Sequence, residues 1–395
     1  MLTTSLAMAL IGFQSPTLTH VTDQPTAGPQ GKRAEGVPPF WVRPGYKVSI
    51  AAEKLPQTRF MAFDDKGNLY VSSPDLGKIT VLARKGDRYE VKSTYAEGYP
   101  KVQAMQFVDG SLWFATSGAI YKSKDSNGDG KMDDVSTVIG EGTVPNGSGH
   151  WWRSLLVTED SIYTSVGDTG NANDLTDTER QKIWRFDRDG GNKRMFISGI
   201  RNTEKLLVRP GTKDIYGIDH GSDWFGGPLG DREGRQPITD FNPPDELNLY
   251  QEGHFYGHPF LTGFRVPRVE YQTRKDLIDL AEKTTVPVWA FGAHWAANSF
   301  CFISQRGPFP ADHVGDIFAA CHGSWNSKSK VGYRVERICF DPSTGLPYGS
   351  LVIVGCLDKD GNVLARPVDC VQAPDGSVLF SSDSDGRIYR IASDK

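Results

Sequence analysis

MAFDDKGNLYVSS, residues 61–73, joins a short apolar run to a second, alternating run through a polar turn rich in Asp, Gly and Asn. Two apolar runs separated by such a turn are typical of a β-hairpin. Further copies begin at Met105 (MQFVDGSLWFATS), Leu155 (LLVTEDSIYTSVG), Leu206 (LLVRPGTKDIYGID), Val371 (VQAPDGSVLFSSD) and, with a longer turn, Phe300. The sequence therefore predicts six related hairpins.

The spacing of the hairpins predicts the fold class. The first four copies start 44, 50 and 51 residues apart, close to the length of one four-stranded propeller blade. Six copies predict an all-β, six-bladed β-propeller. Residues 40–51 and the C-terminal GRIYRIASDK both have strand character, so we expect the two termini to close the ring within one blade. The longer later intervals predict loop insertions on one face, with a helix over 275–283 and the pocket on that face.

Composition excludes some classes of function. The 44 Lys and Arg residues are balanced by 48 Asp and Glu, which argues against a nucleic-acid binder held by phosphate contacts. Beyond the first dozen residues, no apolar run approaches the roughly 20 residues of a membrane span, so no integral membrane segment is expected. Five cysteines lie in apolar, strand-like runs and suggest small buried side chains, although one disulfide is not excluded.

The N-terminal region differs in composition from the rest of the chain. Residues 1–15 carry a short apolar core without a preceding Lys or Arg, and residues 16–39 are rich in Thr, Pro, Gly and Gln. Residues 1–39 are therefore interpreted as a candidate signal peptide and linker, which predicts a periplasmic or secreted protein. Residues 40–395 are expected to form the propeller as a catalytic domain.

Two polar clusters stand where blades are expected to begin. NGSGHWWRSLL contains His150, whose side chain has a pKa suited to a general base, unless it is structural. GIRNTEKL contains Arg201 and Asn202 at the equivalent point of the next blade. An arginine there can bind a carboxylate or stabilise an oxyanion, or form only a salt bridge. Because blade-start residues converge on the axis of a propeller, these side chains are expected to meet.

Further polar side chains extend this set. CHGSWNSKSKVGYR and LARPVDC, together with the arginine that follows His150 in the first cluster, supply cationic and aromatic groups. They predict a pocket for an anionic ligand. FGAHWAANSF adds His294, which either lines that pocket or packs in the fifth blade. The members of this set are Arg153, Arg201, His322, Trp325, Lys330 and Arg366.

Two stretches have oxygen-rich patterns suited to Ca²⁺. DSNGDGKMDD follows the spacing of an EF-hand-like loop, but Ser136 stands where a bidentate Glu is usual. A merely acidic hairpin tip is the alternative. The positions that match the loop are Asp125, Asn127, Asp129, the Lys131 carbonyl and Asp133. DHGSDWFGGP and NPPDELNLY form a weaker pattern, which is more typical of simple turns than of a Ca²⁺ site.

Taken in order, the clusters resemble the soluble pyrroloquinoline quinone (PQQ) dependent sugar dehydrogenases, the glucose and sorbosone dehydrogenase family of six-bladed propellers. The resemblance extends over residues 39–391. The segments that carry it are the GH..R segment at His150, GIRN, PPDELN with GHFYGHP, GDIFAACHGSWN, and RPVDCVQAPDGS with GRIYRI.

The resemblance implies PQQ and Ca²⁺ as cofactors. It makes His150 the base that takes the proton of the sugar's anomeric hydroxyl as hydride passes to the quinone, and Arg201 the group that stabilises negative charge on the quinone oxygen. Carbonyls of Gly221 and Ser222 would bind Ca²⁺, and Arg366 would contact PQQ. The remaining expected cofactor contacts are Arg153, Asn202, His220, Asp245, His322, Trp325 and Lys330.

The leading hypothesis is a PQQ- and calcium-dependent oxidoreductase that oxidises an aldose or related sugar aldehyde and passes electrons to a cytochrome or quinone. One alternative is a calcium-dependent, lactonase-like hydrolase, and the other is a propeller that binds carbohydrate or protein without catalysis. Trp151 and Trp152 depart from the family pattern, in which smaller residues are common. Their side chains are expected to narrow the sugar pocket, to stack on sugar faces or only to pack in the protein interior.

Overall fold

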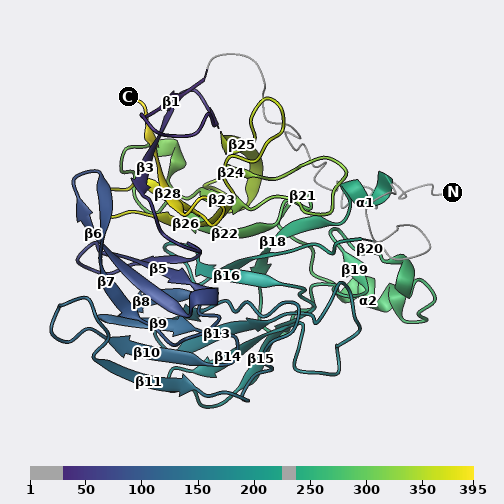
Figure 1. The fold of residues 1–395 in the computed structure, drawn as a ribbon. Helices are drawn as coiled ribbons and strands as arrows, with labels where there is room; N and C mark the ends of the chain where they lie inside the picture. Colours follow the sequence, from purple (N-terminus) through teal and green to yellow (C-terminus); the bar gives the residue numbers. More distant parts are fainter. Residues whose placement is uncertain (1–29, 225–236) are drawn as a thin grey trace.

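The computed structural model describes residues 30–224 and 237–395, so most of the candidate signal peptide and linker lies outside it. Six sheets of four or five described strands are arranged around a central axis, and a separate pair of short strands lies in an insertion (Figure 1). Within each blade the strands are given from the innermost outward. The first and second blades are β4 (Met61–Phe63), β5 (Leu69–Ser73), β6 (Lys78–Lys85) and β7 (Arg88–Ala96), and β8 (Met105–Val108), β9 (Ser111–Ala115), β10 (Ile120–Lys124) and β11 (Asp134–Ile139). The third and fourth blades are β12 (Leu156–Val157), β13 (Ser161–Val166), β14 (Lys182–Asp187) and β15 (Arg194–Ser198), and β16 (Thr203–Val208), β17 (Ile215–Asp219), β18 (Pro244–Tyr250) and β21 (Trp289–Ala293). The fifth and sixth blades are β22 (Ala297–Phe302), β23 (Ile317–Cys321), β24 (Arg334–Phe340) and β25 (Pro347–Gly355), and β26 (Pro367–Gln372), β27 (Val378–Ser382), β28 (Arg387–Ser393) and β3 (Tyr46–Ala52).

The six predicted hairpins are the two innermost strands of the six blades, and all six pairs are antiparallel. The innermost strands contact one another in the order β4, β8, β12, β16, β22, β26 and back to β4. The predicted six-bladed propeller is therefore confirmed. Second strands such as β5 and β9 are buried along their whole length, because neighbouring blades cover both of their faces.

The ring closes through the two ends of the described chain. β3 pairs antiparallel with β28 and so forms the outermost strand of the last blade, as expected for residues 40–51 (Figure 1). Two short strands extend this closure: β1 (Lys32–Arg33) pairs with β3, and β2 (Trp41–Val42) pairs with β25. Backbone hydrogen bonds between segments at opposite ends of the sequence thus complete the last blade, and the chain continues from β3 into the first blade.

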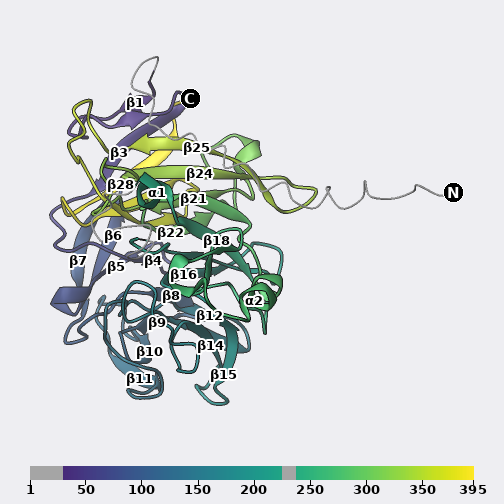
Figure 2. The ribbon, with the colours of Figure 1, turned by 90° about the vertical axis from the view of Figure 1, so that its right-hand side faces the viewer.

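The fourth blade carries the longest insertions. α1 (Pro237–Phe241) precedes β18, and the segment between β18 and β21 contains β19 (Leu261–Thr262), β20 (Val266–Pro267), the 3-10 turn η2 (Val269–Tyr271) and α2 (Leu277–Lys283). α2 confirms the predicted helix and lies at the edge of the ring (Figure 2). The Tyr271 hydroxyl donates to the Ala172 carbonyl at 2.8 Å, so this insertion packs on the loop after β13.

Polar contacts tie the blades together at the axis. The Lys205 amino group at the start of β16 donates to an Asp369 carboxylate oxygen at 2.5 Å, and the backbone nitrogen of Met61 donates to the other oxygen at 2.8 Å. The Ser299 hydroxyl also donates to Asp369. Because the Asp369 side chain is fully buried, these contacts hold together the inner strands of four blades.

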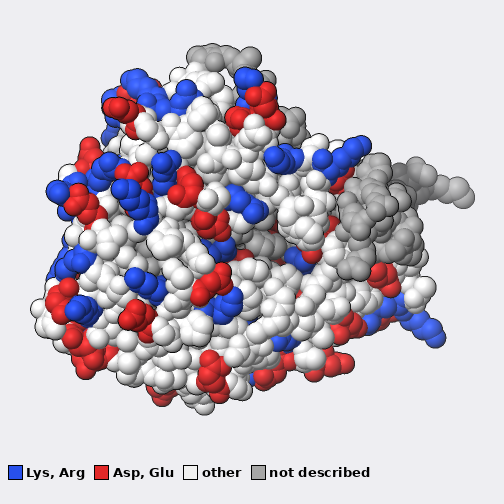
Figure 3. Space-filling model, in the orientation of Figure 1, with Lys and Arg blue, Asp and Glu red and all other residues white. Residues whose placement is uncertain are grey.

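The remaining sequence expectations concern cysteines and membrane spans. All five cysteines are buried and unpaired, which agrees with their interpretation as small apolar side chains. Within the two described ranges, no helix combines the length and apolar character that crossing a bilayer requires. On the face shown in Figure 3, basic and acidic side chains intermix over the coloured residues.

Candidate functional site

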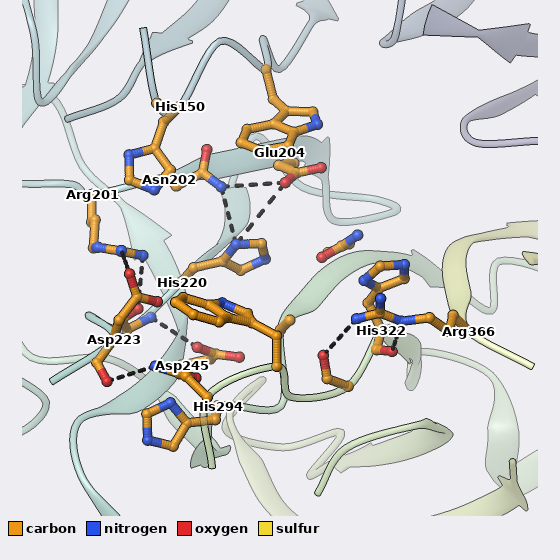
Figure 4. A pocket seen from close by; sticks show the side chains of 18 of the residues that line it. His150, Arg201, Asn202, Glu204, His220, Asp223, Asp245, His294, His322 and Arg366 are labelled. Atoms are coloured by element: carbon orange, nitrogen blue, oxygen red, sulfur yellow. Dashed lines mark hydrogen bonds and ion pairs between the residues drawn. The ribbon is translucent and has the colours of Figure 1, made fainter. Parts of the chain in front are cut away.

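A cavity of about 400 Å³ lies where the loops that precede the innermost strands meet the loops that join the second and third strands (Figure 4). Such a volume suits a small cofactor with a substrate beside it. Its walls are Arg59, Gly149, His150, Trp152, Arg201, Asn202, Glu204, His220, Gly221, Asp223, Asp245, His294, Ala296, Asn298, His322, Gly323, Trp325, Asn326 and Arg366.

Most residues singled out from the sequence share this cavity. They come from the third, fourth, fifth and sixth blades and from the connections between blades. The predicted residues in the cavity wall are His150, Arg201, Asn202, His220, Gly221, Asp245, His294, His322, Trp325 and Arg366. Ser222 lies just outside, in a small adjoining cavity that Gly221 also lines.

His150 stands in the loop before β12 as a neutral base. Its Nδ1 lies 2.9 Å from the carbonyl oxygen of Asp168, and a carbonyl only accepts, so Nδ1 carries the proton. Nε2 is then left with a lone pair. Burial, together with the positive charge of Arg201, lowers the pKa of His150 from 6.5 to about 3. The imidazole is therefore neutral near pH 7.

Asp168, which follows β13, fixes this arrangement. One carboxylate oxygen lies 2.7 Å from Nε2 of His258 and 2.9 Å from the backbone nitrogen of Asn173, and the other accepts from the Gly170 nitrogen at 2.8 Å. Burial alone raises the pKa of Asp168. The contact with His258 and the backbone donors outweigh burial, and the pKa lies below its usual range. A fully bonded, buried carboxylate makes this loop rigid.

Arg201, just before β16, is held by several acceptors. Its guanidinium donates to the Asn171 carbonyl at 2.7 Å, the Gly221 carbonyl at 2.8 Å and the Asp223 carboxylate at 3.0 Å. The backbone nitrogen of Arg201 donates to Asp219 at 2.8 Å. This buried cation is thus fixed beside His150 rather than free to turn.

A second network starts from Asn202 (Figure 4). Its side-chain nitrogen donates to Nδ1 of His220 at 3.0 Å and to Glu204 at 3.2 Å. Glu204 also accepts from Gln103 at 2.9 Å and from Arg59 at 3.4 Å. Burial raises the pKa of Glu204 and lowers that of His220 to about 3. Residues at the starts of the first, second and fourth blades are therefore joined in one network beside the cavity.

Arg366, just before β26, carries a positive charge without a counterion. Its Nε donates to the His322 carbonyl at 3.3 Å and its Nη2 to the Gly323 carbonyl at 3.0 Å. Among the residues that the structure describes, no carboxylate lies within ion-pair distance of it. The neighbouring carboxylate of Asp383 instead contacts Nε2 of His322 at 3.0 Å and Arg59 at 3.0 Å. The Arg366 charge is thus available to an anionic ligand.

Buried acids lie behind the loop that contains Gly221. Asp245 accepts from the backbone nitrogens of Gly221 at 2.8 Å and Ala297 at 2.9 Å, and burial raises its pKa to about 7. Burial also raises the pKa of Asp219 to about 6 and that of Glu246 to about 8. The three carboxyls therefore titrate near neutral pH rather than near pH 4.

Two predicted cofactor contacts do not line the cavity. The guanidinium of Arg153 is buried and donates to the backbone carbonyls of Pro145 and Trp152, so it shapes the loop that carries His150. Burial lowers the pKa of Arg153 to about 9. Lys330 is exposed, and its amino group donates to the Gly361 carbonyl at 2.9 Å. Both side chains therefore bond to backbone carbonyls outside the cavity wall, and their contacts with a cofactor stay predictions.

The EF-hand-like loop joins the outer strands β10 and β11, away from the cavity. Asp125 accepts from the backbone nitrogens of Gly128 at 2.7 Å and Gly130 at 2.8 Å. Asp133 accepts from Ser126, and Asp129 accepts from Lys131. Over residues 30–224 and 237–395, no three or more His, Cys, Asp or Glu side chains are grouped to hold a metal ion. Calcium at this loop stays a prediction.

Sequence reasoning did not single out Arg59, Glu204, Asp223 or Asn298, which also line the cavity. The blade-start rule that found Arg201 applies equally to Arg59, which stands two residues before β4. Glu204 lies within the GIRNTEKL cluster, two residues after Asn202. Asp223 carried a weaker signal, because acids in long loops are common.

A comparison with models of protein families gives one match over most of the chain. The family model described as TrAA12-like matches residues 40–394. An uncharacterized protein of Borreliella burgdorferi is 30% identical over 202 residues, which are 50% of this chain and 48% of that protein. The chain thus spans about half the length of the curated relative that it matches.

Solved structures share the propeller. The holo form of the pyranose dehydrogenase PQQ domain from Coprinopsis cinerea has a TM-score of 0.76 at 18% identity, over 91% of this chain and 99% of that chain. The calcium structure of the Trichoderma reesei family AA12 protein has a TM-score of 0.75 at 18% identity, over 91% and 98%. The apo soluble aldose sugar dehydrogenase of Escherichia coli has a TM-score of 0.61 at 17% identity, over 88% and 99%.

These relatives confirm the family resemblance that the sequence motifs indicated. At such low identities, the solved structures by themselves support the six-bladed fold. The family match says more, because the family model covers residues 40–394, from β2 to the end of β28. On that evidence the chain belongs to the TrAA12-like family.

Proposed function

We propose that this protein is a PQQ- and calcium-dependent dehydrogenase that oxidises an aldose at its anomeric carbon. One observation carries the proposal: the neutral imidazole of His150 and the unpaired guanidinium of Arg366 face the same cavity. A base and a site for an anionic cofactor are the two features that this reaction needs. The names of the similar structures, a pyranose dehydrogenase PQQ domain and an aldose sugar dehydrogenase, support it.

The residues present suit PQQ, a flat molecule with three carboxylates. Arg366 forms no ion pair with a described carboxylate, and the half-buried guanidinium of Arg59 and the buried one of Arg201 stand on other walls. Charged hydrogen bonds to carboxylates are strong, and arginine is suited to make them in pairs. Asn202, His220 and His322 would add neutral donors and acceptors around the rings.

The residues of the chain then have separate tasks. Nε2 of His150 accepts the proton of the anomeric hydroxyl, and its Nδ1 stays bonded to the Asp168 carbonyl. When bound, PQQ supplies the two-electron acceptor: the C1 hydrogen leaves as hydride, and the sugar becomes its lactone. Arg201, fixed by Gly221 and Asp223, holds positive charge next to the base and disfavours early protonation of the imidazole.

Calcium is proposed at the loop after β17, where the carbonyls of Gly221 and Ser222 are the oxygen donors. Hard cations such as Ca²⁺ prefer oxygen ligands. The Gly221 carbonyl already accepts from Arg201, and a carbonyl oxygen has a second lone pair for a cation. We also propose an electron acceptor of the cytochrome or quinone type and a periplasmic or secreted location, both of which rest on the family resemblance and the N-terminal sequence.

One experiment separates the candidate functions. The purified protein is incubated with PQQ, with Ca²⁺ or with both, and dye reduction is measured with a panel of aldoses while lactone hydrolysis is followed in parallel. Reduction that requires PQQ supports the proposal, and dependence on added Ca²⁺ supports the metal. Lactone hydrolysis without PQQ would indicate the hydrolase instead. Sugar binding without either reaction would indicate a binding protein.

A further inference from the structure

A second pocket lies between the first and second blades, at the opposite end of the strands from the proposed active site. The β4–β5, β8–β9 and β10–β11 turns border it, whereas other loops build the cavity of the active site. This rear pocket has a volume of about 100 Å³, equal to about three water molecules at roughly 30 Å³ each. Asp64, Tyr70, Phe107, Leu112 and Asp125 are among its walls.

Tyr70, the second residue of β5, brings an unpartnered hydroxyl to this pocket. The residue is 3% exposed, and its ring packs edge-on against Tyr95 of the first blade and Phe107 of the second, with centroids 5.0 and 4.7 Å away. Over residues 30–224 and 237–395, nothing donates to or accepts from the Tyr70 hydroxyl. Its oxygen is not closed off as the unpaired hydroxyl of Tyr89 is, so it opens on the pocket. A buried polar group that lacks a protein partner points to a ligand or a water molecule.

Two carboxylates in the same wall carry charge without a counterion. Asp64 accepts from the backbone nitrogen of Asn68 at 2.8 Å, and Asp125 accepts from that of Gly130 at 2.8 Å. Both side chains are half-buried, and neither forms an ion pair with a Lys or Arg of the described chain. Burial, and after it the charges of Asp64 and Asp125, raise the pKa of Tyr70, so the hydroxyl keeps its proton.

These groups suit a cation that donates hydrogen bonds. A primary ammonium group has three N–H donors, enough for one phenol oxygen and two carboxylates. The described ranges contain no three His, Cys, Asp or Glu side chains grouped to hold a metal ion, which favours an ammonium ion over a metal here. Phe107 and Leu112 add an apolar wall for a short carbon chain. Lys66 and Lys124 also border the pocket, but both are exposed, and among the described residues neither pairs with these carboxylates.

We propose that the rear pocket binds a small organic ammonium ion, whose nitrogen donates to Tyr70 and is neutralised by Asp64 and Asp125. The volume limits such a ligand to about four non-hydrogen atoms. Because its walls come from two blades, a bound ligand links them and stabilises the folded protein by mass action. The inference is independent of the proposed function, since the rear pocket shares no wall with the cavity of the active site.

The test compares propylammonium with two analogues by isothermal titration of the full chain at constant ionic strength. 1-Propanol keeps the carbon chain and lacks the charge, and tetrapropylammonium keeps the charge and lacks N–H donors. We expect saturable binding of propylammonium with a Kd on the order of 1 mM, and at least about tenfold weaker binding of both analogues. The Tm should rise with the concentration of propylammonium. The titrations are run with Ca²⁺ present and again after chelation.

Variants assign the binding to the rear pocket. Tyr70→Phe removes only a hydroxyl that has no protein partner, so its Tm without ligand should match that of the parent. Its Kd should rise about tenfold, because a hydrogen bond to a charged group is lost, and Asp64→Asn should have a similar effect. Tyr216→Phe is the matched control, because Tyr216 is the second residue of β17 and its hydroxyl donates to the Gly345 carbonyl at 3.4 Å, outside the rear pocket. Glu159→Gln controls for the loss of a charge at another hairpin turn.

Several results would overturn the inference. Equal affinity for 1-propanol and propylammonium would show an apolar hollow without charge recognition, and no saturable binding would show a pocket that holds only water. An unchanged Kd in Tyr70→Phe, or an equal loss in Tyr216→Phe, would place the binding elsewhere. Propylammonium binding that appears only after chelation, together with weaker Ca²⁺ binding in Tyr70→Phe, would make the rear pocket a metal site instead.

Discussion

The carbonyl oxygen of Asp168 lies 2.9 Å from Nδ1 of His150, while the carboxylate of the same residue lies 2.7 Å from Nε2 of His258. One aspartate therefore links the proposed base in the third blade to the insertion of the fourth blade. The carbonyl sets the imidazole tautomer, and the carboxylate contact holds the carbonyl in place. The orientation of the base thus depends on a residue that is 108 positions away in sequence from it.

Replacing the proposed base should separate catalysis from cofactor binding. His150→Gln removes the proton acceptor, and positioned general bases contribute typically about 10²- to 10⁴-fold to the rate. We expect turnover with PQQ to fall by that amount while PQQ affinity, measured by equilibrium titration, stays within a factor of about three. Turnover that stays at the parental level would remove His150 from the mechanism.

The sequence predicted the fold because each blade repeats a local pattern. A hairpin is encoded within about a dozen residues, so six copies predicted six blades. Blade-start positions likewise predicted that His150 and Arg201 would meet at the axis. These predictions needed only the topology of the ring and the position of a residue in its blade.

Other parts of the site depend on contacts that no local pattern encodes. Arg59 and Glu204 are 145 residues apart and join across the axis. His258 and Asp168 are 90 residues apart and meet only because the fourth-blade insertion folds back. Lys330 was expected in the pocket, but sequence alone does not reveal in which direction a loop side chain points. Strand periodicity gives no information on such loops.

Arg366 should contribute to PQQ affinity more than any exposed cation. Arg366→Gln removes a charge without a described counterion from the cavity wall, and a hydrogen bond to a charged group contributes about 1.5–3 kcal/mol, or roughly 10- to 100-fold in Kd. Lys330→Gln is the control, because the Lys330 amino group is exposed and bonded to the Gly361 carbonyl. Equal losses of PQQ affinity in the two variants would contradict the assignment of Arg366.

Calcium removal should distinguish the two candidate metal sites. The double variant Asp125→Asn, Asp133→Asn removes charge from the loop between β10 and β11, away from the cavity. If Ca²⁺ acts at Gly221 and Ser222, this variant keeps its PQQ-dependent activity, and a chelator inactivates it as it does the parent. Activity is measured before and after chelation and again after Ca²⁺ is restored. Loss of activity in the untreated variant would implicate the outer loop.

Glu246 should make the folded state less stable as the pH rises. Burial and the neighbouring charges of Asp219 and Asp245 raise its pKa from 4.5 to about 8, so the folded protein favours the protonated acid. The stability that this preference contributes is fully present below pH 4.5 and is lost as the pH rises through about 8. Glu246→Gln stays neutral, and its oxygen can keep the hydrogen bond from the Gly263 nitrogen, which is 2.7 Å long.

The substituted amide also has a partner. In the parent, the side-chain nitrogen of Asn248 donates to Glu246 at 3.3 Å, and the Oδ1 of Asn248 finds no hydrogen-bond donor among the described residues. When the Asn248 amide turns over, its Oδ1 accepts from the new amide nitrogen. Without PQQ and Ca²⁺, we expect the Tm of Glu246→Gln relative to the parent to increase between pH 5 and pH 8.5. Glu159→Gln, at an exposed hairpin turn, controls for the loss of one surface charge. A Tm difference that stays constant or shrinks over this range would show that Glu246 is already ionised in the folded protein at pH 5.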